Sequence, residues 1–224
     1  MFVHGPLYEK RKIIVSELQK VGLETGDIVY SASSVRGPLG IPFGKWIQRF
    51  THSPYSHATL IQVENGEYYA IDVSDWGTRK LRVIDWFDNW GATDFCVCRL
   101  QNKTEKDNLC LDYQIKRFLD MDPSYDFNFV DPNAFYCTEA VKQMYGNCGF
   151  DLGGAFLVKD MVPWWFYKLI VIGNYVTKLF SNSSLPLDVP ISVVGNIHRG
   201  MLASPLTKII YEYDSETQTF LSFV

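Results

Sequence analysis

The sequence predicts a single α+β domain in which helices pack against an antiparallel sheet. Residues 57–63 and 67–73 are two β-rich runs separated by Glu64-Asn65-Gly66, and Asn-Gly favours a tight hairpin turn. Residues 107–120 carry apolar side chains at helical spacing, and a second helix is expected over about 135–147. The domain is expected to span residues 1–224, with an aromatic, apolar insertion at about 150–190.

The remaining segments complete this expectation. An amphipathic helix over residues 8–21 is stopped by Gly22, and a short buried strand follows at 27–31. Gly37, Pro38, Gly40 and Pro42 indicate an irregular loop before a short helix at 45–50. Further strands are expected at 80–83, 94–100 and 207–213.

Composition excludes several classes of protein. Apolar residues make up 47% and charged residues 21% of the 224 residues, which is typical of a folded globular protein. The 25 acidic and 21 basic residues give a net charge of -4, so nothing indicates a nucleic-acid partner.

The cysteines do not predict a metal site. The chain has five, without the paired C-x-x-C spacing of zinc or redox centres, so we expect reduced thiols, no metal and no cofactor. They are Cys96, Cys98, Cys110, Cys137 and Cys148. Residues 1–15 lack the apolar stretch of a secretory signal, and we therefore expect a cytoplasmic protein.

Cys137 has the setting of a nucleophile. It falls in the first turn of the helix expected from residue 135, where unpaired backbone N–H groups and the helix dipole favour a thiolate. The same N–H groups could hold a developing oxyanion. A cysteine on a helix face is more often simply buried, and the other four cysteines fit that description.

His57 begins the first hairpin strand and is the candidate base. If Asn65 and Gly66 alone form the turn, Glu64 faces Glu67 and Thr59 faces Asp72. Asp72 then shares a sheet face with His57 and lies within reach of its ring. A turn longer by one residue would send Asp72 to the opposite face, so an orienting role and an ordinary solvated position both stay open.

Three short motifs carry a family resemblance. They are Gly-Asp-Ile-Val-Tyr at 26–30, Ser-Pro-Tyr-Ser-His-Ala at 53–58 and Tyr-Cys-Thr-Glu-Ala-Val at 136–141. In this order they resemble the permuted NlpC-like papain superfamily, and most of all its YiiX-like branch, over about residues 24–150. The resemblance implies a circularly permuted papain-like core with helices on one side of an antiparallel sheet. It also implies a Cys137–His57 pair, with Asp72 where the family often has Glu.

Members of this superfamily cleave or transfer at amide and ester bonds. We therefore expect a cysteine hydrolase that acts on a peptide-like or acyl-containing small substrate through a thioester, with Tyr55 and Tyr136 lining the cleft. A lipid-directed acyltransferase and a catalytically silent binding module are the alternatives. Residues 161–180 are too interrupted by polar side chains for a transmembrane helix. Contact with a membrane surface, an apolar lid and a helix that completes the core all stay open for them.

Overall fold

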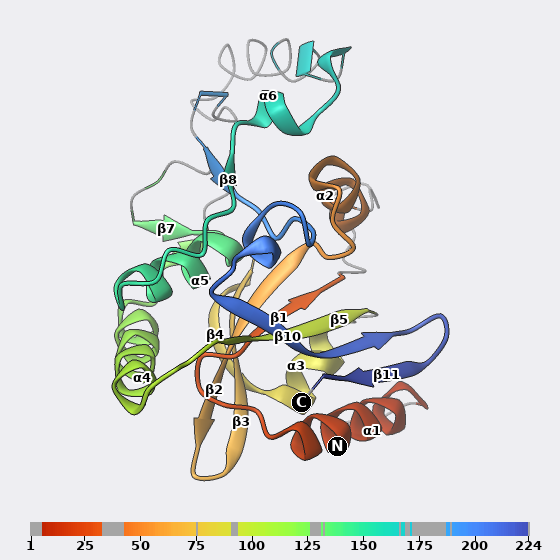
Figure 1. Ribbon diagram of the computed structural model, residues 1–224, viewed down its shortest axis with the longest axis vertical. Coiled ribbons are helices and arrows are strands. Elements are labelled where there is room, and N and C mark those ends of the chain that lie inside the picture. Colours follow the sequence, from red (N-terminus) through yellow and green to blue (C-terminus); the bar gives the residue numbers. More distant parts are fainter. Residues whose placement is uncertain are drawn as a thin grey trace.

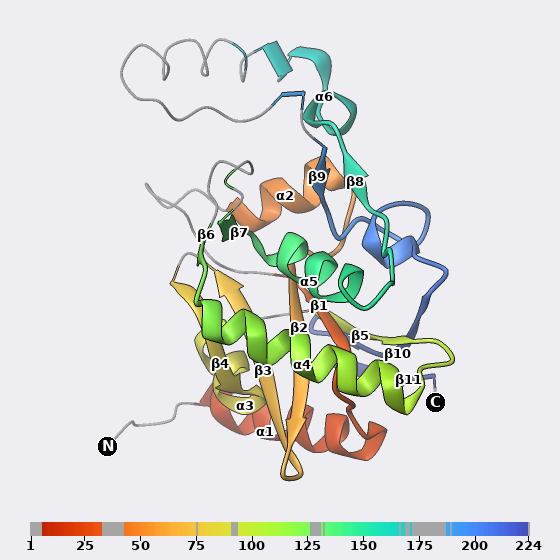
Figure 2. The same cartoon turned by 90° about the vertical axis from the view of Figure 1, so that its left-hand side faces the viewer.

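The protein is described by a computed structural model that covers residues 6–32, 43–74, 76–90, 94–125, 131, 133–165, 167–168, 171, 187–188 and 190–223. These residues form a seven-stranded antiparallel sheet with helices against it (Figures 1 and 2). The expected α+β class is confirmed. The loop expected around Gly37 to Pro42 lies outside the described residues.

The sheet has the strand order β11-β10-β5-β1-β2-β3-β4. In chain order its strands are β1 (Ile28–Ser31), β2 (His57–Glu64), β3 (Glu67–Ser74), β4 (Gly77–Arg82), β5 (Phe95–Leu100), β10 (Thr207–Asp214) and β11 (Thr219–Ser222). The helices are α1 (Pro6–Val21), α2 (Phe43–Thr51), α3 (Val83–Trp90), α4 (Glu105–Met121), α5 (Cys137–Gly146) and α6 (Val158–Met161). The short pairs are β6 (Ser124–Tyr125) with β7 (Ala134–Phe135), and β8 (Ala155–Phe156) with β9 (Ile191–Ser192), and a 3-10 turn spans Met201–Ala203.

The hairpin of β2 and β3 has the register expected for a two-residue turn. Glu64 pairs with Glu67, and the ladder continues to Leu60 opposite Ile71. Asn65 and Gly66 both have positive φ, 53° and 79°, as a type I′ turn requires. This register sets which strand residues face each side of the sheet.

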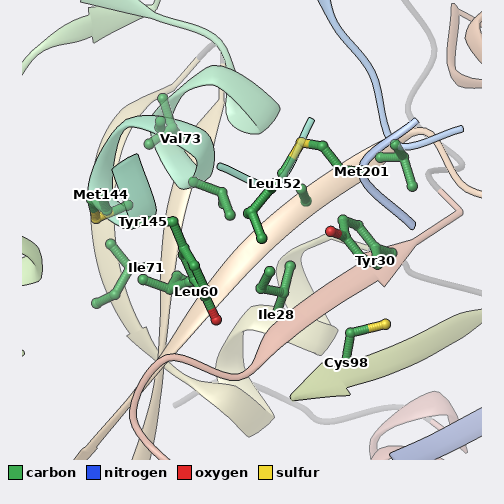
Figure 3. Close-up of a cluster of buried hydrophobic side chains, with 14 of the residues drawn as sticks. Ile28, Tyr30, Leu60, Ile71, Val73, Cys98, Met144, Tyr145, Leu152 and Met201 are labelled. Atoms are coloured by element: carbon green, nitrogen blue, oxygen red, sulfur yellow. The ribbon is translucent and has the colours of Figure 1, made fainter. Parts of the chain in front are cut away.

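Two cores lie on opposite faces of the sheet. One contains Ile28, Leu60 and Ile71 from the strands and is covered by α4 and α5, as Figure 3 shows for Met144 and Tyr145. The other contains the strand residues that alternate with these along each strand, and it is covered by α1 and α3. The expectation of helices on one side only is therefore wrong, because the apolar faces of α1 and α3 need the second face of the sheet for burial.

The Gly-Asp pair before β1 has a structural explanation. Gly26 has φ +91°, and a Cβ at this position would lie 2.5 Å from Leu111 Cδ1. Asp27 is fully buried and accepts two hydrogen bonds from Arg99 of β5, at 2.9 and 2.7 Å. This ion pair joins the beginning of β1 to the end of β5.

Some elements differ from the expectation. Residue 83, expected at the end of a strand, begins helix α3, in which Val83, Trp86 and Phe87 are buried at helical spacing. The helix expected from residue 135 begins at Cys137, because Ala134 and Phe135 pair with β6.

The expectation of five reduced thiols is also wrong. Cys110 of α4 and Cys148, just after α5, form a disulfide, whereas Cys96, Cys98 and Cys137 are free and buried. The two helices pack side by side against the sheet, which brings together sulfurs 38 residues apart. The cytoplasmic location stays a prediction, and a disulfide, more common in oxidising compartments, does not favour it.

Removing this disulfide should destabilise the fold. A cross-link that closes a loop of this length restricts the unfolded chain and typically contributes about 2–4 kcal/mol. We expect the Cys110→Ser/Cys148→Ser variant to lose stability of this size in urea unfolding. Dithiothreitol should destabilise the wild type and leave the double variant unchanged, and equal effects on both proteins would contradict the assignment.

Candidate active site

Cys137 is the first residue of α5. Tyr136, the residue before it, has the extended backbone of a helix cap, φ −98° and ψ 166°, and its side chain does not cap the helix. The sulfur therefore lies beside N–H groups of the first helical turn, where the helix dipole favours negative charge. Cys137 is 9% exposed, so this thiol is almost completely buried.

His57 is the first residue of β2, at the end of the strand. Its Nε2 lies 2.7 Å from Oδ1 of Asp72, and the ring stacks on Trp86 with 6.5 Å between ring centroids. Because Nε2 is engaged by Asp72, Nδ1 is the ring nitrogen that can serve Cys137. The side chains of His57 and Cys137 are hydrogen-bonded to each other, which joins the early strand to the late helix.

Asp72 is a buried carboxylate with donors from three elements. Besides His57, it accepts a hydrogen bond from Nη2 of Arg79 at 2.8 Å and from Nε1 of Trp86 at 3.1 Å. Arg79 lies directly opposite Asp72 on β4, and Trp86 belongs to α3. Burial alone raises the pKa of Asp72, but its hydrogen bonds to these groups lower it well below the ordinary value. Asp72 is therefore an anion at neutral pH.

Cys137 and His57 favour a thiolate and an imidazolium. Burial alone raises the pKa of Cys137, but the charge and hydrogen bond of His57, with the backbone N–H groups of Ala58 and Thr138, lower it below its ordinary 9.0. Burial alone lowers the pKa of His57, but the charge of Cys137 and the hydrogen bond to Asp72 raise it from 6.5 to about 10. Both shifts therefore favour transfer of the thiol proton to His57.

The expected cleft residues, Tyr55 and Tyr136, are both buried. Tyr55 belongs to the core beside α5, and its Oη donates to Glu212 at 3.0 Å. The Oη of Tyr136 accepts a hydrogen bond from the backbone N–H of Ser192 at 2.6 Å. Each side chain thus has a structural contact, and contact with a substrate stays a prediction for both.

Arg79 and Trp86 were missed by the sequence analysis, although each left a signal. Arg79 lies two residues past Gly77, where the chain turns from β3 into β4, and counting back from this turn pairs it with Asp72. The i, i+3 and i+4 spacing of Val83, Trp86 and Phe87 is that of an amphipathic helix. Neither signal alone shows that both side chains donate to one carboxylate.

A cysteine at a helix N-terminus, paired with a histidine on an antiparallel strand, defines a papain-like protein. The chain matches the model of the permuted papain-like amidase enzymes, the YaeF/YiiX or C92 family, over residues 22–166. This protein belongs to that family.

A solved structure shows the same fold. The crystal structure of the metalloprotein yiiX from Escherichia coli O157:H7 superposes with a TM-score of 0.65 at 22% sequence identity, covering 85% of this chain and 98% of that one. The comparison with curated proteins gave no significant match. In the described part of this chain, no three His, Cys, Asp or Glu side chains are grouped so that they could hold a metal ion.

The pH dependence of Cys137 alkylation should reveal the ion pair. In the wild type, the rate with iodoacetamide should rise at a pH below 9.0 and change again only near pH 10, where His57 loses its proton. In a His57→Gln variant the midpoint should move to higher pH, because burial raises the pKa of the thiol and only the backbone N–H groups of Ala58 and Thr138 still oppose it. An unchanged midpoint would rule out activation of Cys137 by His57.

Arg79 should lower the pH at which acid unfolds the protein. The ionised Asp72 stabilises the protein above its unfolded-state pKa of about 3.9, and this contribution is lost as the pH falls through the lowered folded-state pKa. An Arg79→Met variant should raise the folded-state pKa, move acid unfolding to higher pH and cost about 1–3 kcal/mol at neutral pH. Fluorescence during acid and urea titrations measures both effects.

Arg82 provides the matched control. It lies at the end of the same strand and forms an exposed ion pair with Asp85, so Arg82→Met should change stability by less than about 1 kcal/mol. Arg79→Lys should recover part of the loss, because it keeps the charge. If Arg79→Met and Arg82→Met unfolded at the same pH, Arg79 would not hold Asp72 in its ionised form.

Proposed function

We propose that this protein is a cysteine hydrolase that cleaves an amide or ester bond through a thioester on Cys137. One observation carries the proposal: the thiol at the start of α5 is hydrogen-bonded to His57, which is itself held by a buried carboxylate. Membership of an amidase family supports the same chemistry.

The reaction follows from the charges of the site. The Cys137 thiolate attacks the acyl carbonyl carbon, and the carbonyl electron pair moves onto oxygen. Backbone N–H groups of the first turn of α5, among them that of Thr138, stabilise that oxyanion. The tetrahedral intermediate collapses, the bond to the leaving group breaks, and His57 donates its proton to the departing amine or alkoxide.

Water completes the cycle. His57, now neutral, accepts a proton from the water that attacks the thioester, and the Cys137 thiolate leaves as the acid product forms. Asp72 keeps the His57 ring in one orientation and stabilises the imidazolium in both steps. Arg79 and Trp86 act through Asp72 and are positioning residues.

The family description favours an amide substrate over an ester. An acyltransferase would use the same thioester with a different acceptor, so the site chemistry does not separate the two activities. A silent binding module would not need a buried carboxylate to orient His57. Burying that charge costs free energy, which a protein without catalysis would have no reason to spend. The complete Cys137, His57 and Asp72 set therefore supports an enzyme.

Labelling with acyl probes tests this proposal. We expect an acyloxymethyl ketone, which a thiolate attacks with loss of the carboxylate, to label the wild type at Cys137 and the Cys137→Ser variant not at all. Asp72→Asn should reduce the labelling rate by at least tenfold without unfolding the protein, since His57 loses its orienting charge. Mass spectrometry of the labelled peptide identifies the site.

Cys98→Ala is the control, because Cys98 is a free, buried thiol on β5. Its labelling should equal that of the wild type. Equal labelling of the wild type and the Cys137→Ser variant would exclude Cys137 as the nucleophile. For a protein that is labelled at Cys137, product analysis with added water-soluble amines distinguishes hydrolysis from acyl transfer.

A further inference from the structure

The chain leaves the papain-like body between β8 and β9. These two strands pair through Ala155 with Ser192 and Phe156 with Ile191, and α6 follows β8 directly. Figures 1 and 2 show α6 projecting beyond the sheet at the end where α2 also lies. We call the described residues between β8 and β9 the excursion: 157–165, 167–168, 171, 187–188 and 190.

The excursion has a small core of its own at its base. Val158 and Met161 are buried there against Val193, with partly buried apolar residues around them. This core does not include the tryptophans that follow, since Trp164 is 71% exposed and Trp165 is 54% exposed. The sequence left open whether this segment completes the core, and for these two side chains the answer is that it does not.

The exposed face combines indoles with positive charge. The Nζ atom of Lys168 lies 4.7 Å from the ring centroid of Trp164. The described charged residues of the excursion are two cations, Lys159 and Lys168, and two anions, Asp160 and Asp188. The described excursion therefore has no net charge, and the positive charge of this face is that of Lys168 beside Trp164.

Tryptophan beside lysine is the combination that suits a lipid–water boundary. An indole inserts its apolar ring among the upper acyl chains and keeps its N–H at the head groups. A lysine beside it reaches the phosphates. The structure has no helix, in the part that it describes, long and apolar enough to cross a bilayer. Contact through the excursion would therefore be peripheral.

The base of the excursion is hydrogen-bonded to the helix turn that carries Cys137. The N–H of Ser192 donates to Oη of Tyr136 at 2.6 Å, and Oγ1 of Thr138 donates to the carbonyl of Ser192 at 2.8 Å. Tyr136 and Thr138 are the residues directly before and after Cys137 in the sequence. The tryptophans and the nucleophile are thus parts of one connected end of the molecule.

We propose that the face formed by Trp164, Trp165 and Lys168 docks this protein on a phospholipid surface. Docking orients the end of the molecule that bears Cys137 toward the head groups. The excursion acts as the membrane-binding element and takes no part in bond cleavage, so lipid binding does not depend on the proposed hydrolase activity.

Vesicle sedimentation tests the proposal. The full chain is mixed with sucrose-loaded vesicles of phosphatidylcholine, alone or with 20% phosphatidylserine, and the bound fraction is measured after centrifugation. We expect the wild type to bind both, and the anionic vesicles more tightly at low salt, since Lys168 contributes a charge. The Trp164→Ala/Trp165→Ala variant should bind at least tenfold more weakly.

The matched control removes two exposed apolar side chains from another surface. Leu109 and Tyr113 of α4 are 64% and 62% exposed, and the Leu109→Ala/Tyr113→Ala variant should bind vesicles like the wild type. Cys137→Ala should also bind normally, which separates docking from catalysis. Equal urea-unfolding midpoints show that the tryptophan variant is folded.

Two results would overturn the proposal. One is a wild-type protein that stays in the supernatant with both kinds of vesicle. The other is a Trp164→Ala/Trp165→Ala variant that binds as tightly as the wild type. A self-association that the tryptophan variant loses, without vesicle binding by the wild type, would assign this face to a second copy of the chain.

Discussion

The buried charge of Asp72 is the constraint on which the site depends. A carboxylate without water must receive hydrogen bonds from the protein, and those of Asp72 come from β2, β4 and α3. The three elements must therefore be placed together before His57 has a fixed orientation. The same anion keeps a proton on His57, and this proton in turn favours the thiolate of Cys137. The reactivity of the Cys137 sulfur on α5 thus depends on side chains that pack on the opposite face of the sheet.

Strand alternation explains how these groups meet. His57 and Asp72 belong to the set of strand residues that faces α3, whereas α5 covers the other face. The contact with Cys137 is made at the end of β2, because His57 is the first residue of that strand. The backbone N–H of Ala58 reaches the same sulfur. A histidine further along β2 would be separated from α5 by the sheet itself.

Local patterns were enough to predict the parts of this arrangement that depend on neighbouring residues. The Asn65-Gly66 turn fixed the register, and the register placed Asp72 on the face of His57. The donors to Asp72 depend on tertiary packing, so Arg79 was missed although it lies on the adjacent strand. Helix α3 was missed because its first residues also suit a strand. The disulfide depends on how α4 and α5 pack together, and the spacing of the cysteines carries no trace of that.

The disulfide lies at the opposite end of α5 from the nucleophile. Cys148 follows Cys137 by eleven positions, which corresponds to about 16 Å along a helix at 1.5 Å per residue. A thiolate must touch a cystine sulfur to attack it, and the rigid helix between them prevents this. Intramolecular scrambling is therefore blocked by geometry. One chain can therefore hold a permanent disulfide and an activated thiolate at the same time, without exchange between them.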